Sequence, residues 1–119
     1  MNRDLPFLKH ILDETAFLLK ETEDITFDAF IKDELLKRGC TRSLEIIGEA
    51  TKNISPELKN KHKDIEWKRM AGIRDKIIHY YFGVNWDIVW SVLQEKIPEL
   101  KQSIATIIKD LEAKNNLTF

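Results

Sequence analysis

The chain has 119 residues, of which 33% are charged and 43% apolar, with a formal net charge of −1, four glycines and three prolines. This length suits one domain with a modest core, and the composition excludes disordered and fibrous proteins. We expect one domain over residues 1–119, with a frayed tail from about residue 115. No apolar run is long enough for a membrane span, and the N-terminus does not read as a secretory signal. Cys40 is the single cysteine, which excludes an internal disulfide and fits a cytoplasmic protein.

Apolar residues recur at three- to four-residue spacing along the chain, which predicts helices and no strands. The first helix is predicted to begin with Asp4 as its N-cap and to end near Thr22. A second helix, long and with a bend at Gly39, is predicted over residues 27–53, with Thr26 as its N-cap. Together these two helices cover about two fifths of the chain.

The second half of the chain predicts shorter helices. Ser55-Pro56-Glu57 is a helix start, with an N-cap, a proline at the first helical position and an acid behind it, and this helix should end near residue 62 or 63. The next helix is predicted over residues 67–80. Asn85 is a suitable N-cap for the following one, and Pro98 either kinks that helix or starts another. The predicted fold class is all-α, an up-and-down bundle of four or five helices.

One eight-residue stretch, Arg74 to Tyr81, brings together a fixed cation, a titratable imidazole and a phenol. Arginine suits the binding of phosphate, and histidine can exchange a proton near neutral pH. On a helix Asp75 and His79 are four residues apart and can touch, and Arg74 shares a face with Tyr81. Such a site would be shallow on one chain, which favours a homodimer that completes it.

Each of these residues also has a purely structural interpretation. Asp75 can be a solvated acid that pairs with Lys76 or Arg69, and His79 can be a core or interface histidine. Tyr81 can be a packing aromatic. The stretch alone does not decide between these readings and a catalytic site.

Charge is distributed unevenly around this stretch. Residues 59–76 hold seven basic and three acidic side chains, a net of +4, so the remainder of the chain carries −5. This segment is either a solvated face or a positive field that attracts an anionic polymer.

Three further positions carry alternatives. Glu45 and Glu49 are spaced as a helix-face carboxylate pair that either holds a metal or is solvated and paired with Arg42. Gly48, between them, can mark a close approach of two helices. Cys40 has no histidine near it in sequence, so we do not expect it to be catalytic, and one cysteine is too few for a zinc site.

The pattern Arg74-x4-His79-x-Tyr81 resembles the RX4HXY signature of the HEPN superfamily (higher eukaryotes and prokaryotes nucleotide-binding), and within it the HepT-like toxin family. Residues 42–50 are similar to that family's second-helix segment, residues 65–74 to the approach to its motif, and residues 79–85 to its exit. The resemblance therefore spans about residues 42–85. Members usually carry an acid where Asn85 stands, and often Asn where Asp75 stands.

The resemblance implies a metal-independent endoribonuclease without a cofactor, acting on RNA as the toxin of a toxin–antitoxin pair. It implies that Arg74 and His79 are catalytic, that Asp75 orients His79, and that Tyr81 contacts RNA. It further implies a small nucleotidyltransferase antitoxin as partner, which transfers AMP to Tyr81, and a homodimer.

Two other classes of protein remain open. One is a non-catalytic helical subunit that presents nucleotide or substrate to a nucleotidyltransferase, which has no need of both Arg74 and His79. The other is a plain helical dimerisation domain with no site.

Overall fold

The computed structural model describes residues 2–77 and 83–116, with no account of the side chains of residues 2, 77, 115 and 116. Its described residues form helices and no strand, as the sequence predicts. In chain order the elements are a 3₁₀ turn η1 (Asn2–Asp4), α1 (Leu5–Thr22), α2 (Phe27–Lys32), α3 (Glu34–Lys52), α4 (Pro56–Lys61), α5 (Trp67–Ala71), α6 (Ile73–Ile77), α7 (Trp86–Ser91), the π-helical turn η2 (Val92–Lys96) and α8 (Ile97–Asn116).

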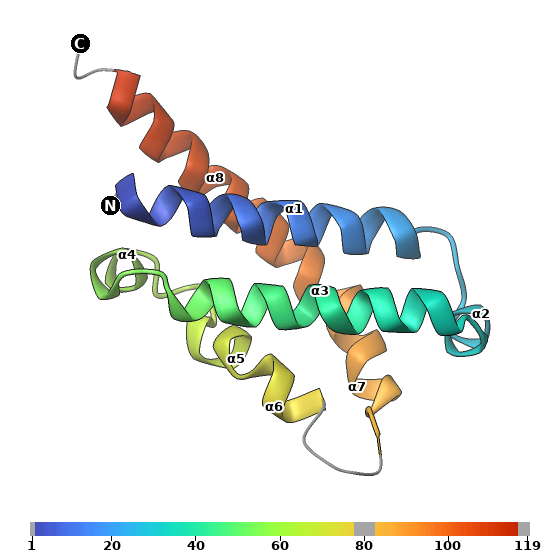
Figure 1. Cartoon of the computed structure of the whole chain (residues 1–119). Helices are drawn as coiled ribbons and strands as arrows, with labels where there is room; N and C mark the ends of the chain where they lie inside the picture. The colour runs from blue at the N-terminus through green and yellow to red at the C-terminus, as the bar shows by residue number, and fades with distance from the viewer. Residues whose placement is uncertain (1, 78–82, 117–119) are drawn as a thin grey trace.

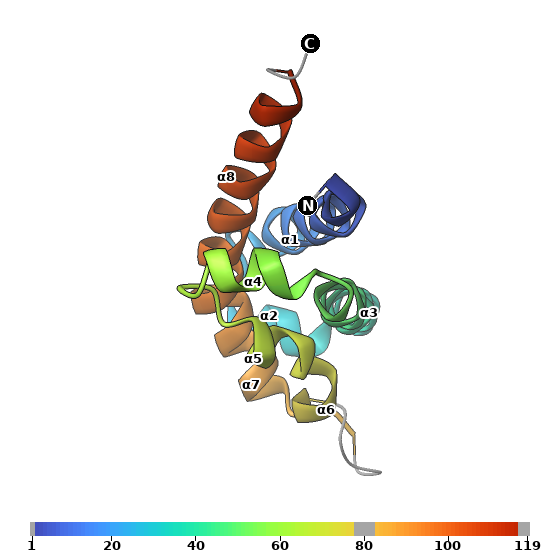
Figure 2. The same cartoon turned by 90° about the vertical axis from the view of Figure 1, so that its left-hand side faces the viewer.

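The three long helices α1, α3 and α8 make the frame of the bundle. α1 and α3 lie side by side and run in opposite directions, and α8 crosses behind α1 (Figure 1). Viewed along α1 and α3, α8 covers one flank of the pair, and α5 and α6 lie below α3 (Figure 2). We call α5 and α6 together the limb, because they pack on α3 and carry Arg74.

The core lies between the frame helices. Its fully buried side chains include Leu8 and Ile11 of α1, Leu44 and Ile47 of α3, and Ile104 of α8. Burying such a side chain contributes roughly 1.5–3 kcal/mol each, so these helices are held mainly by tertiary packing.

Three of the predicted N-caps are confirmed. The Thr26 hydroxyl accepts the Ala29 N–H at 3.1 Å, the Ser55 hydroxyl accepts the Leu58 N–H, and the Asn85 side chain accepts the Ile88 N–H. The prediction that Asp4 caps α1 is wrong, because its side chain accepts instead the buried N–H and hydroxyl of Ser55, at 2.8 and 2.7 Å. This contact joins the start of α1 to the start of α4.

The prediction of one helix over residues 27–53 is also wrong, since the chain breaks at Asp33. The Asp33 backbone is extended (φ −97°, ψ 93°), and its carboxylate accepts the Leu36 N–H at 2.9 Å, so it ends α2 and caps α3. The break changes the phase of the helix, which leaves Leu35 83% exposed although it fits the predicted apolar stripe. Gly39 lies within α3 and produces no break.

The predicted helix over residues 67–80 is likewise divided, at Gly72. This residue has φ −93° and ψ 7°, a turn conformation, and glycine is the weakest ordinary helix former. The predicted end near Tyr80 falls outside the described residues.

At Pro98 the helical path neither ends nor restarts abruptly. The preceding turn widens to π geometry, in which the Ile97 N–H donates to the Val92 carbonyl. Proline lacks an N–H and its ring crowds the carbonyl four residues earlier, and a wider turn relieves both problems.

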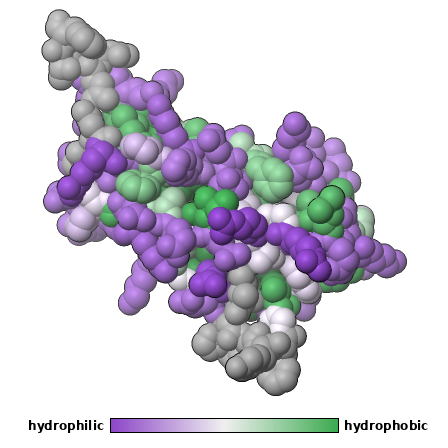
Figure 3. Space-filling view, viewed as in Figure 1, coloured by the Kyte–Doolittle hydropathy of each residue, from purple (hydrophilic) through white to green (hydrophobic). Residues whose placement is uncertain are grey.

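Aromatic side chains tie α2 to α7. Phe30 packs on the rings of Trp86 and Trp90, at centroid distances of 5.9 and 5.2 Å. The Lys37 ammonium lies 5.0 Å from the Trp86 ring centroid and pairs with Glu34 at 2.7 Å. These contacts anchor the segment that follows residues 78–82. On the face seen in Figure 3, hydrophilic residues cover most of the surface and hydrophobic ones form separate patches.

Candidate active site

Arg74 opens the predicted motif and lies on α6, a helix of five residues. Its neighbour Ile73 is buried and fixes the helix against the core, whereas Arg74, Asp75 and Lys76 are exposed. The limb therefore buries its apolar side chains and displays its charged ones.

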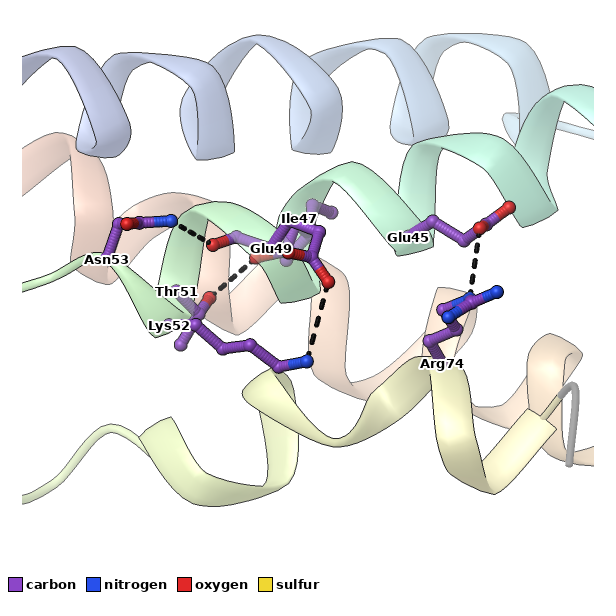
Figure 4. Close-up of polar contacts among 7 residues, drawn as sticks. All are labelled: Glu45, Ile47, Glu49, Thr51, Lys52, Asn53 and Arg74. Atoms are coloured by element: carbon purple, nitrogen blue, oxygen red, sulfur yellow. Dashed lines mark hydrogen bonds and ion pairs between the residues drawn. The ribbon is translucent and has the colours of Figure 1, made fainter.

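The guanidinium of Arg74 is held by a carboxylate from the frame. Its Nε lies 3.1 Å from Oε2 of Glu45, and Figure 4 shows the two side chains reaching toward each other from α6 and α3. The Glu45 side chain is 24% exposed and that of Arg74 is 56% exposed. The pair thus lies at the surface, with its acid partly covered and its base open to solvent.

Gly48 explains why the limb can lie this close to α3. A Cβ atom at Gly48 would lie 3.4 Å from the backbone oxygens of both Met70 and Ala71. The prediction of a close helix approach at Gly48 is confirmed. Glu45 precedes Gly48 by three residues and Arg74 follows Ala71 by three, so the antiparallel helices bring both side chains to the same level.

The rest of the motif is not placed by the structure. His79, Tyr80 and Tyr81 lie outside the described residues, so the contact between Asp75 and His79 stays a prediction. Arg69, which was one of the two ion-pair partners considered for Asp75, pairs instead with Glu66 at 3.0 Å.

Sequence reasoning missed the partner of Arg74. It read Glu45 as half of a carboxylate pair with Glu49, but each acid has its own cation: Glu45 pairs with Arg74 rather than Arg42, and Glu49 pairs with Lys52 at 3.4 Å. Among residues 2–77 and 83–116, no three His, Cys, Asp or Glu side chains gather as a metal site. The signal available beforehand was Gly48, which marks where another helix approaches this face.

Comparison with known families adds to this geometry. A family model described as "Ribonuclease HepT-like" matches residues 11–107. The chain belongs to the HepT-like ribonuclease family. The match covers Glu45 and Arg74 as well as His79 and Tyr81.

Named relatives of this HepT-like chain share most of its length. A protein of Caldanaerobacter subterraneus subsp. tengcongensis named "Putative RNase TTE0752" is 47% identical over 92% of this chain and 97% of its own. A Methanocaldococcus jannaschii protein named "Putative RNase MJ0127" is 43% identical over 92% of this chain and 90% of its own. A Thermococcus cleftensis protein named "Probable ribonuclease HepT" is 41% identical over 80% of this chain and 86% of its own. No solved structure matches significantly.

The basic segment of this HepT-like chain forms a shallow hollow beside the limb, of about 590 Å³. Lys59, Lys63 and Lys68 line it together with Arg69 and Glu66. Glu66 bonds both Arg69 and Lys96, and the hydrogen bond from Lys96 is the main cause that lowers the Glu66 pKa. One acid thus offsets part of the positive charge, and the lysines leave the hollow basic.

A second cavity, of about 300 Å³, lies between the limb and the α7–α8 segment. Met70, Ile73 and Leu100 line it, and Lys76 and Lys96 are among its polar residues. Lys76 is on this side of α6, whereas Arg74 faces α3, so the cavity and the Glu45–Arg74 pair lie on different sides of the limb.

Cys40 is unsuited to nucleophilic chemistry. It is fully buried, and burial, followed by the nearby charges of Asp33 and Glu21, raises the pKa of its thiol from 9.0 to about 11. The thiol is therefore protonated at neutral pH. Among the residues that the structure describes, no helix is long and apolar enough to cross a membrane.

Proposed function

We propose that this protein is an endoribonuclease that cleaves RNA without a metal ion and is the toxin of a toxin–antitoxin pair. Membership of the HepT-like ribonuclease family supports the activity. The single observation that carries the site assignment is Arg74, presented at the surface with its Nε held by Glu45. RNA as substrate, together with the single buried cysteine, favours the cytoplasm as the place of action.

The proposed chemistry uses the residues of the motif and the 2′-hydroxyl of RNA. His79 accepts the proton of the 2′-hydroxyl, and the 2′-oxygen attacks the phosphorus. The bond from phosphorus to the 5′-oxygen then breaks, and the 5′-oxygen takes a proton from an acid or from water. Arg74 stabilises the charge on the phosphate. Asp75 orients His79. The products are a 2′,3′-cyclic phosphate and a 5′-hydroxyl, which restricts the reaction to RNA.

The proposed regulation acts on Tyr81. A small nucleotidyltransferase transfers AMP to its hydroxyl, which adds bulk and negative charge beside Arg74 and blocks RNA. A homodimer would place two motifs across one cleft and so deepen a site that is shallow on one chain. Co-expression with a nucleotidyltransferase encoded beside it should add the mass of AMP to the wild type and leave Tyr81→Phe unmodified; modification of Tyr81→Phe would contradict this assignment.

The activity is tested by incubating RNA with purified protein in EDTA. Wild type should cleave and leave cyclic phosphate ends, whereas His79→Ala and Arg74→Ala should not. His10→Ala is the matched control, because His10 is exposed and lies outside the motif. Cleavage by His79→Ala, or the absence of cleavage by folded, unmodified wild type, would overturn the proposal, and the second result would favour a non-catalytic partner subunit of a nucleotidyltransferase.

A further inference from the structure

We propose that Glu45 is a positioning residue that holds the Arg74 guanidinium in the orientation that engages the scissile phosphate. This inference rests on the proposed function, because it assigns to Glu45 a part in the same reaction. Glu45 lies 29 residues before Arg74 and outside the RX4HXY pattern. Only the fold brings the two side chains together.

The geometry of the contact leaves the phosphate-binding edge of the arginine available. The Glu45 carboxylate lies 3.1 Å from Nε, and among the residues that the structure describes Arg74 forms an ion pair with no other side chain. A guanidinium is a rigid planar fork, so fixing one nitrogen restricts the direction of the others. The two terminal nitrogens can then meet two phosphate oxygens in a bidentate contact.

The acid stands on the more rigid of the two elements. Glu45 belongs to α3, a 19-residue helix whose buried residues include Leu44 and Ile47 on either side of it. Arg74 belongs to a five-residue helix and has a long, exposed side chain. An exposed arginine on a short helix samples many rotamers unless a contact restrains it, and Glu45 on the frame helix α3 provides that contact.

Exposure argues that this pair serves geometry more than stability. Ion pairs at the surface contribute little to the free energy of folding, because water screens them. Glu45 also places a negative charge near the phosphate, which weakens ground-state attraction. A carboxylate in this place is therefore useful only if orienting the guanidinium in the transition state outweighs that repulsion.

Three substitutions test, in the RNA cleavage assay, whether Glu45 acts through the contact of its side-chain oxygen with Nε or through its negative charge. Glu45→Ala removes both and should lower kcat by about tenfold to a hundredfold, with no rise in KM. Glu45→Gln removes the charge and keeps a side-chain oxygen at the position that contacts Nε, so it should retain most of kcat. Glu49→Ala is the matched control, because Glu49 is one turn away on α3 and pairs with Lys52.

A double-mutant cycle tests whether Glu45 acts through Arg74. Because Arg74→Ala should not cleave, the cycle uses Arg74→Lys, which keeps a positive charge but lacks the planar fork. Adding Glu45→Ala to Arg74→Lys should cause no further loss, because the group to be positioned is already gone. Arginine Nε–H signals in NMR spectra of wild type, Glu45→Ala and Glu45→Gln provide an independent readout: the Arg74 signal should shift in Glu45→Ala and stay close to wild type in Glu45→Gln.

The possible failures can be told apart. An active wild type with a fully active Glu45→Ala, equal losses in Glu45→Ala and Glu45→Gln, or additive losses in the cycle would overturn the inference and leave the proposed function standing. A folded wild type that does not cleave RNA would overturn the proposed function, and this inference with it.

Discussion

The frame and the limb are both helical, but they differ in length and in what they bury and expose. The frame helices α1, α3 and α8 have 18, 19 and 20 residues, and each buries a long face of mainly apolar side chains. The helices of the limb have five residues each, and they expose Arg74, Asp75 and Lys76. Stability thus resides in the frame, whereas the limb presents charged side chains from a position that the frame fixes.

A short helix can therefore carry a site when its backbone packs closely against a long helix. Helices of five residues are not stable in isolation. The limb is held by the buried side chains of Trp67, Met70 and Ile73 and by backbone contact at Gly48. Four measurements test this division of roles between frame and limb.

The largest effect is expected in the frame. Leu44→Ala removes a fully buried side chain of α3 and should lower the free energy of unfolding by about 2–5 kcal/mol. Urea denaturation measures the change. Ile46→Ala, at a half-buried position on the same helix, is the control and should cost less. An equal loss at both positions would contradict the assignment of the core to this face.

The next effect is expected where frame and limb meet. Gly48→Leu forces side-chain atoms toward the Met70 and Ala71 carbonyls and should cost about 1–3 kcal/mol in urea denaturation, with loss of RNA cleavage. Gly39→Leu is the matched control, because a Cβ there meets only the ring of Phe17, at 3.5 Å, which is itself 40% exposed. Equal stability of the two variants would show that the packing of the limb on α3 does not require a glycine at position 48.

A smaller effect concerns the pH dependence of the frame. The folded protein holds the pKa of Cys40 at about 11, against an ordinary value of 9.0. Between these values the unfolded thiol loses its proton first, so stability falls as pH rises, by about 1 kcal/mol at pH 10, and is nearly unchanged below about pH 8. Urea denaturation at pH 8 and pH 10 measures it. Cys40→Ala should lose less stability over this interval; an identical loss would contradict the assignment.

The smallest effect on stability is expected in the limb. Arg74→Ala removes an exposed ion pair and should change the free energy of unfolding by about 0–1 kcal/mol. Lys52→Ala is the control, because it removes another exposed pair on α3 that is remote from the motif. A loss of several kcal/mol in Arg74→Ala alone would mean that the limb, too, is structural.

The sequence predicted well what depends on neighbouring residues. The helical class follows from local periodicity, and the caps at Thr26, Ser55 and Asn85 follow from short polar side chains before helical segments. Asp33 could have been recognised as a cap on the same grounds. It was missed because the apolar spacing continues across it through Leu35, which the structure leaves exposed.

What depends on distant residues was largely out of reach. Asp4 does not cap its own helix because Ser55, 51 residues away, offers two buried donors. The partner of Arg74 depends equally on how α5 packs on α3. Periodicity reports which face of a helix is buried, but not which residue of another helix lies opposite it. The roles of His79 and Tyr81 rest on the sequence pattern alone.

The Glu45–Arg74 pair also has a consequence for the response to temperature. Its two members belong to elements whose local stabilities differ, because the limb has far fewer buried side chains than the frame. Proteins open in parts, and the least packed parts open first. Warming should therefore detach Arg74 from Glu45 while α1, α3 and α8 remain folded, so that thermal inactivation is a reversible event that precedes denaturation.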